Sequence, residues 1–224
     1  LFVGPTGTGK TATAKALTKI LFAQENDSAE KLLRFDMSLH QSLTDIPQLL
    51  GTSDGKVQGL LTESVQEHPY ATLLLDELEK AHHDLLNIFL TIFDEGYYMN
   101  GSGRRIDCKH LIIIATTNVE RIDDVFSPEF INRFDGIVPF HSLDSINILS
   151  IARLISDEII NNYIQLHNIH INVSDDFLKQ IVTDHYDERY GARDVQRLIS
   201  AAIEDTIAKK ILENEIKSGD NVTL

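Results

Sequence analysis

The sequence is poor in cysteine, in basic residues and in long apolar runs. Its 224 residues include one cysteine, Cys108. A single cysteine excludes an internal disulfide bond and fits a reducing compartment, so we expect a cytoplasmic protein. No apolar run approaches the about 20 residues of a membrane-spanning helix, so we expect no membrane partner. The chain begins inside a predicted strand with no signal peptide before it, which indicates a segment of a longer protein.

Basic residues are outnumbered by acidic ones. There are 20 Lys and Arg against 34 Asp and Glu, which gives a formal net charge of −14 at pH 7. An acidic surface repels phosphate backbones, so we expect no nucleic-acid partner, although a local basic patch is compatible with this charge. The nine histidines show no Cys/His pattern of zinc-site spacing, and we expect them to be solvated or core residues.

A glycine-rich turn stands at the start of the chain. It matches G-x-x-x-x-G-K-[ST] between an apolar strand end and an apolar run that predicts a helix. In this setting backbone N–H groups turn inward around phosphate oxygens, and the positive helix end stabilises their charge. We therefore predict a nucleoside triphosphate site in which Lys10 reaches the β- and γ-phosphates and Thr11 binds Mg²⁺. The predicted contacts are Gly4, Pro5, Thr6, Gly7, Thr8, Gly9, Lys10, Thr11 and Ala12.

A later apolar run ends in two acidic residues. The run Ala71–Leu75 predicts a strand buried on both faces, as in a parallel sheet. Asp76 and Glu77 follow at its carboxyl end, where such strands present ligands. A strand end can carry this pair by chance, but the phosphate loop upstream favours a functional role. We expect Asp76 to hold Mg²⁺ through water and Glu77 to polarise the attacking water.

Further strands and helices alternate along the first part of the chain. Asn118 follows a predicted strand over 111–115, where its amide is placed to orient the water that attacks phosphorus. A helix is predicted from Ser127, a capping residue before Pro128, and we expect Arg133 to end it. Strands are also predicted over 32–37 and 137–140, helices over 42–50, from 60 and over 85–93, and a glycine-rich turn over 96–105.

The alternation of strands and helices ends near His141. We predict an α/β domain with a parallel sheet over residues 1–141 and a small, mostly helical domain over 142–224. The second domain is expected to contain helices over 144–167 and 174–186, a third helix opened by Gly191, and short strands over 169–173 and at the C-terminus.

Taken together, these residues resemble the AAA+ superfamily of P-loop ATPases. Four segments resemble the second ATPase module of the Clp chaperone ATPases of the ClpA, ClpB and ClpC types: Leu74–His82, Gly103–Asp107, Phe126–Arg133 and Tyr190–Arg193. The resemblance covers essentially the whole chain. It implies a three-layer sandwich whose five strands lie in the order five-one-four-three-two, with a helical lid over the nucleotide. It also implies six-membered rings that use ATP hydrolysis to pull polypeptide through a central pore.

The resemblance also assigns roles to residues outside the phosphate loop. Asn118 becomes the polar sensor of the γ-phosphate, and Arg133 the arginine finger that reaches the neighbouring subunit's site. Cations that arrive only in the assembled ring suit the charge that develops on a transferred phosphoryl group. The alternative for Arg133 is that it caps the C-terminus of its own helix.

In the lid, the resemblance makes Arg193 a phosphate contact within the same chain and Ile151 and Ala192 further nucleotide contacts. The alternative for Arg193 is a surface ion pair with Asp194 or Asp187.

The loop that grips substrate in the family departs from its pattern here. Family members carry Gly-Tyr-Val-Gly followed by further glycines, whereas this chain has the shorter Gly55–Gly59 with Lys56 in place of the aromatic residue. A large aromatic ring offers contact area to a sliding chain, and lysine does not. Tyr97 and Tyr98 are candidates to replace the missing aromatic residue that grips substrate. Core or surface positions are the better interpretation for both.

Two further departures bear on partners. The family's Asp-Met-Ser-Glu ends here in Leu39, so its glutamate is missing. Only the eight residues Val119–Phe126 separate Asn118 from the next helix, where family members insert a longer segment that carries the peptidase-docking loop. We therefore do not expect a ClpP-type peptidase partner.

The sequence thus supports an ATP-hydrolysing module that works in a ring on a protein substrate, and the resemblance implies that this ring is a hexamer. The alternative is an ATP-switched assembly or remodelling module that binds a partner without threading it, which the shortened loop favours. A DNA-handling motor or clamp loader is disfavoured by the acidic charge and the Clp-like segments.

Overall fold

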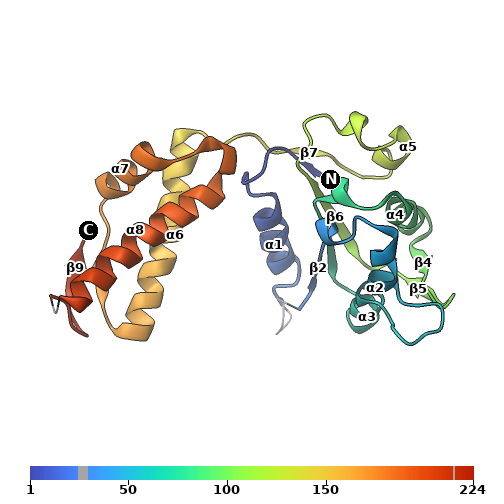
Figure 1. Ribbon diagram of the computed structural model, residues 1–224, viewed down its shortest axis with the longest axis horizontal. Coiled ribbons are helices and arrows are strands. Elements are labelled where there is room, and N and C mark those ends of the chain that lie inside the picture. The colour runs from blue at the N-terminus through green and yellow to red at the C-terminus, as the bar shows by residue number, and fades with distance from the viewer. Residues whose placement is uncertain (25–29, 214) are drawn as a thin grey trace. The chain divides into compact units, whose positions relative to one another are not determined.

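The computed structural model describes residues 1–24, 30–213 and 215–224. The chain forms two compact units (Figure 1). The first contains Leu1–Pro5 and Gly9–Phe140, and the second contains Thr6–Thr8 and His141–Leu224. Each unit encloses a hydrophobic core of its own.

A five-stranded parallel sheet runs through the first unit (Figure 1). Its strand β3 (Thr72–Asp76) is buried at every position, as expected for a strand covered on both faces. The flanking strands are β2 (Leu32–Asp36) and β6 (Ile112–Thr117), and β1 (Phe2–Val3) and β7 (Val138–Pro139) complete the order β2-β3-β6-β1-β7. Counted along the chain, this is the predicted order five-one-four-three-two, which is confirmed.

The helices that connect these strands are α1 (Lys10–Leu21), α3 (Leu60–Glu67) and α4 (His83–Glu95), together with two shorter ones. We predicted one helix over 42–50, and this is wrong: a 3₁₀ turn over Leu43–Asp45 precedes α2 (Ile46–Leu50). Pro47 lacks an N–H and fits only the first turn of an α-helix, so the helix starts anew beside it.

The helix α5 (Pro128–Ile131) begins as predicted, because the Ser127 hydroxyl accepts a hydrogen bond from the Phe130 N–H (3.2 Å). It ends earlier than predicted. The Arg133 N–H donates to the Phe130 carbonyl (3.2 Å), a three-residue spacing that closes the last turn. Arg133 therefore lies beyond the helix and does not end it.

The two adjacent tyrosines lie in a β-hairpin where we predicted only a turn. In it β4 (Tyr97–Met99) pairs antiparallel with β5 (Arg105–Asp107), beside α3 and α4 (Figure 1). Tyr98 is 1% exposed, and its hydroxyl lies 2.9 Å from the Thr62 hydroxyl. Tyr98 is therefore a core residue, whereas the Tyr97 ring packs against the guanidinium of Arg105.

The second unit is mostly helical. Its helices are α6 (Ser145–His167), α7 (Asp175–His185) and α8 (Ala192–Leu212), and a parallel pair of short strands joins β8 (His170–Asn172) to β9 (Asn221–Thr223). Side chains of Asp144 and Ser174 cap α6 and α7. Isoleucines of α6 and α8 fill much of the core. Within the described ranges, no helix combines the length and the apolar character that crossing a membrane requires.

The polar loop from Gly51 to Gly59 in the first unit is closed by glycines at its neck, where its two ends meet. A Cβ on Gly59 would lie 2.2 Å from the Gly51 nitrogen, and one on Gly101 would lie 1.9 Å from the Gly51 oxygen. Inside the loop, the Thr52 N–H donates to the Val57 carbonyl (2.9 Å). Backbones that approach this closely leave no room for a side chain, so the neck requires glycine.

Replacing Gly59 by alanine is expected to lower stability more than replacing Gly55. Both glycines have positive φ, so each substitution costs ~1–2 kcal/mol of backbone strain. Only Gly59→Ala also forces the two backbone segments of the neck apart, because open space surrounds Gly55. Thermal unfolding followed by circular dichroism measures both variants. Equal losses would contradict the closed neck.

Candidate functional site

The phosphate loop leads from β1 into α1 through glycines in unusual backbone conformations. Gly7 and Gly9 have φ of 77° and 97°, where side chains are disfavoured. Gly9 is the N-cap of α1 and offers no side chain to its first turn. The first N–H groups of an uncapped helix point out of its end, and together with the helix dipole they favour an anion.

Lys10 folds back over this loop. Its ammonium donates to the carbonyls of Gly4 (2.7 Å) and Pro5 (2.8 Å) and to Oδ1 of Asn118 (2.9 Å). The residue is 6% exposed, so its charge is held at the loop by groups from two strand ends. The structure thus brings together two residues that the sequence assigned to one site, Lys10 and Asn118.

Asp76 lies at the carboxyl end of β3 with 3% exposure. Its carboxylate accepts hydrogen bonds from the hydroxyls of Thr11 (3.0 and 3.2 Å) and Thr116 (2.6 Å) and from the guanidinium of Arg34 (2.7 and 3.0 Å). Burial alone raises the pKa of Asp76, but the hydrogen bonds from Thr116, Arg34 and Thr11 outweigh it and hold the pKa below its usual value. Asp76 is therefore a carboxylate at neutral pH.

Thr11 and Asp76 form a donor set that fits magnesium. Mg²⁺ prefers hard oxygen ligands and is commonly bound through one or two carboxylates that leave several waters in place. Here a hydroxyl and a carboxylate lie within hydrogen-bond distance of each other at the mouth of the phosphate loop. Because the Thr11 hydroxyl donates its proton to Asp76, its lone pairs remain available to a cation.

Glu77 has a left-handed backbone conformation, with φ 56° and ψ 50°. Such conformations are costly for residues other than glycine and persist only where the surroundings enforce them. The Glu77 N–H donates to the Thr116 hydroxyl (3.1 Å), so one threonine fixes both acidic residues at this strand end. The conformation turns the chain out of β3 directly after Asp76.

Asn118 is held from a second side. Its backbone N–H donates to Oε1 of Glu79 (3.1 Å), which follows β3 in a 3₁₀ turn over Leu78–Lys80. Glu79 thereby fixes the backbone of Asn118, while Lys10 contacts its side-chain amide. The site thus joins the ends of β3 and β6 to the start of α1.

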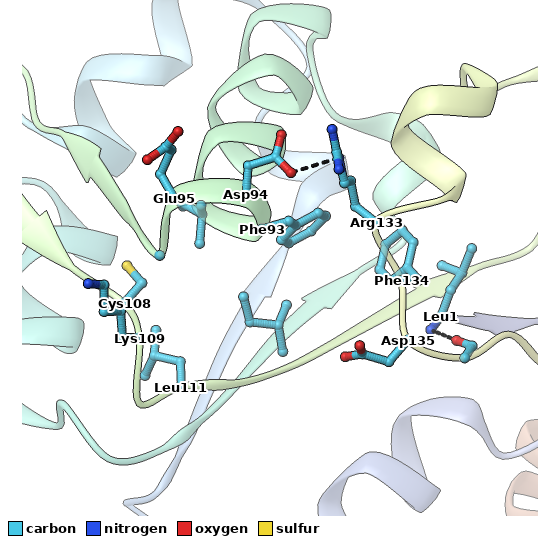
Figure 2. Close-up of a pocket in the computed structure, with 14 residues that line it drawn as sticks. Leu1, Phe93, Asp94, Glu95, Cys108, Lys109, Leu111, Arg133, Phe134 and Asp135 are labelled. Carbon is cyan, nitrogen blue, oxygen red and sulfur yellow. Dashed lines mark hydrogen bonds and ion pairs between the residues drawn. The ribbon is translucent and has the colours of Figure 1, made fainter.

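Arg133 lies elsewhere in the same unit. Its Nε lies 2.7 Å from Oδ1 of Asp94, in the last turn of α4, and Figure 2 shows the two side chains pointing toward one another. They line a cavity of about 480 Å³, and in the described part of the chain its lining includes none of the phosphate-loop residues. The alternative that Arg133 caps its own helix is not what the structure has, because its guanidinium is paired with Asp94 of a different helix.

The predicted residues of the second unit lie at two places. Ile151 is half-buried on α6, and Ala192 and Arg193 form the first turn of α8, where Arg193 is exposed. The carboxylates proposed as alternative partners of Arg193 pair with other arginines: Asp187 with Arg189 (2.6 Å) and Asp194 with Arg197 (2.6 Å). Among the described residues, no ion pair joins Arg193 to either carboxylate.

Four site residues were missed from the sequence. Arg34 and Thr116 bind Asp76, Glu79 binds the backbone N–H of Asn118, and Asp94 pairs with Arg133. The signal for two of them was present, since a polar residue near the end of a strand beside β3 is placed to reach its carboxyl end. The other two depend on contacts that no local pattern encodes.

Comparison with known proteins decides the family. The model of the AAA domain (Cdc48 subfamily) matches residues 1–137, and that of the C-terminal, D2-small domain of ClpB protein matches residues 143–224. The chain belongs to the Clp-type AAA+ ATPases. The predicted family and α/β fold with its small helical domain are thereby confirmed.

Several Clp proteins are similar over nearly the whole chain. The ATP-dependent Clp protease ATP-binding subunit ClpE of Streptococcus pneumoniae is 38% identical over 96% of the chain and 31% of its own length. The chaperone protein ClpB of Corynebacterium efficiens is 37% identical over 99% of the chain and 27% of its length. The chloroplastic chaperone protein ClpC4 of rice, Oryza sativa, is 32% identical over 99% and 27%. The chain spans about a third of the length of these relatives.

Thr116→Val is expected to destabilise this Clp module by ~1–3 kcal/mol, because Asp76 loses a donor and the Glu77 N–H loses its acceptor. Thr72→Val is the matched control: Thr72 is equally buried, and its hydroxyl has no hydrogen-bond partner among the described residues. Removing that hydroxyl should leave stability unchanged or raise it. Urea unfolding of both variants tests this, and a milder effect at Thr116 would count against its role.

Proposed function

We propose that the chain binds ATP with Mg²⁺ and hydrolyses the terminal phosphate. The observation that carries the proposal is the double connection of α1 to the strand ends, Lys10 to Asn118 and Thr11 to Asp76. It gathers a cation for phosphates, a hydroxyl and carboxylate for the metal, and an amide at one edge of the sheet. Bound Mg²⁺ would supply charge neutralisation between the phosphates.

The chain's own residues divide the remaining work. Lys10 holds positive charge over the loop and stabilises the charge that develops on the transferred group. The carboxylate of Glu77, the residue directly after β3, accepts a hydrogen bond from the attacking water and polarises it. Asn118, whose backbone is held by Glu79, positions that water against the γ-phosphate.

We assign residues 1–141 to the nucleotide-binding domain and 142–224 to its lid. In the lid, Arg193 contacts the phosphates, and Ile151 and Ala192 complete the nucleotide contacts. The exposure of Arg193, with its neighbouring carboxylates already paired, supports this role.

Arg133 acts on the site of a neighbouring copy in a ring, which we take to be a hexamer. The placement of Arg133 in a cavity lined by none of the described phosphate-loop residues supports action on another copy. Its ion pair with Asp94 is partly exposed, so the guanidinium is accessible to a partner (Figure 2).

The rate of ATP hydrolysis per subunit is expected to rise with protein concentration and to fall ~10³-fold or more in Arg133→Ala, the range for arginine fingers. Arg121→Ala, which removes an exposed arginine paired with Asp124, is the control and should match the unaltered protein. A phosphate-release assay measures all three. A rate that is independent of concentration and of Arg133 would contradict a shared site.

The substrate is a protein, and the compartment is the cytoplasm. Of the two modes, remodelling without threading is favoured by one observation. An exposed Lys56 occupies the loop tip where an aromatic grip is expected, and Tyr98 is too buried to replace it. That this chain has no ClpP-type peptidase partner remains a prediction. It needs a test, because the similar protein ClpE is named as the ATP-binding subunit of a protease.

Lys56→Tyr is expected to raise ATP-dependent unfolding of a denaturation-sensitive fluorescent protein, because the ring adds an apolar contact to the loop tip. Ser53→Tyr, an aromatic residue elsewhere on the same exposed loop, should not. Loss of fluorescence under a trap for unfolded protein is the readout. Unfolding by the unaltered protein that vanishes in Tyr97→Ala would instead place the grip on the hairpin.

A further inference from the structure

We propose that Arg34 is a positioning residue of the metal site, which sets the orientation of the Asp76 carboxylate and thereby the affinity for the divalent cation. The inference rests on the proposed function, since it concerns the cation that accompanies the nucleotide. It assigns a role to a residue of β2 that lies outside the phosphate loop and outside the acidic pair.

The sheet brings the two residues together. In the parallel pair of β2 and β3, Arg34 lies opposite Leu74 and Asp36 lies opposite Asp76. Arg34 is thus two positions before the residue opposite Asp76, on the same face of the sheet, because side chains alternate along a strand. From there a long side chain reaches the carboxylate diagonally.

Two nitrogens of the Arg34 guanidinium contact the same oxygen of the Asp76 carboxylate and form a fork. Nε and Nη2 of Arg34 lie 3.0 and 2.7 Å from Oδ2 of Asp76. The other oxygen, Oδ1, accepts from Thr116 on β6 (2.6 Å), and the Thr11 hydroxyl lies 3.0 Å from Oδ1 and 3.2 Å from Oδ2. Donors on β2 and β6 therefore hold the carboxylate from both sides, which leaves it one orientation.

The orientation of the Asp76 carboxylate affects the metal site through Thr11. The Thr11 hydroxyl donates to Asp76, so the direction of its lone pairs depends on where the carboxylate lies. If the carboxylate rotates, the hydroxyl follows it, and both oxygen ligands leave the geometry that Mg²⁺ demands. Partners that orient metal ligands in this way typically change metal affinity ~10- to 100-fold when removed.

Charge makes the fork hard to replace. The Asp76 side chain is 5% exposed, whereas that of Arg34 is 42% exposed. A buried carboxylate needs a cation or several hydrogen bonds, and the planar guanidinium supplies both from the edge of the site. Lysine keeps the charge but loses the fixed fork. Arg34→Lys therefore separates geometry from charge.

The test measures binding of a fluorescent ATP analogue to the 224-residue chain as Mg²⁺ is titrated. In Arg34→Lys and Arg34→Met we expect the half-saturating Mg²⁺ concentration to rise ~10-fold or more. Binding in EDTA should stay the same, because the fork touches the metal ligand and not the phosphate loop. Arg153→Met, which removes a forked arginine from exposed Asp175, is the control and should behave as the unaltered protein. Circular dichroism verifies folding.

The outcomes separate this inference from the proposed function. Unchanged Mg²⁺ dependence in folded Arg34→Lys overturns the positioning role, even if Arg34→Met unfolds. Tighter Mg²⁺ binding in both variants also overturns it, because Arg34 would then act as a competing cation. If the unaltered chain binds no nucleotide at any Mg²⁺ concentration, the proposed function fails and this inference fails with it.

Discussion

A buried negative charge at the end of the central strand organises the first unit. Asp76 is almost fully removed from water, and a carboxylate in such a place must be compensated by its neighbours. The compensation comes from Arg34 on β2, Thr116 on β6 and Thr11 on α1. Three separate elements thus have to be in place before the charge is satisfied. The sheet order and the position of α1 are therefore conditions of the site.

The same principle governs two basic side chains of the first unit, one at the site and one away from it. The ammonium of Lys10 is bound to the carbonyls of its loop and to Asn118 at the end of β6. The guanidinium of Arg133 is bound to Asp94 at the end of α4. Each of these two cations is thus paired with a group from an element that is distant in the chain. A displacement of either element would break the pair.

Whether a feature of the fold or the site could be predicted depends on whether one segment of the sequence encodes it or several distant segments do. The apolar run before Asp76 and the glycines before Lys10 are local, and both the parallel sheet and the phosphate loop were predicted from them. Whether Arg34 reaches Asp76 depends on the register between two strands, which no single segment encodes. The hairpin that buries Tyr98 was missed because its turn residues mask two very short strands. Pro47 was overlooked as a helix boundary for a similar reason: one residue changed the geometry within an apolar pattern that still favours a helix.

The glycine neck of the loop between Gly51 and Gly59 has a consequence for how this module diversifies. The two ends of the loop meet backbone to backbone, so the neck depends on its glycines and not on the side chains at the tip. We therefore expect exposed side chains at the tip to vary without disturbing the carboxyl ends of the strands.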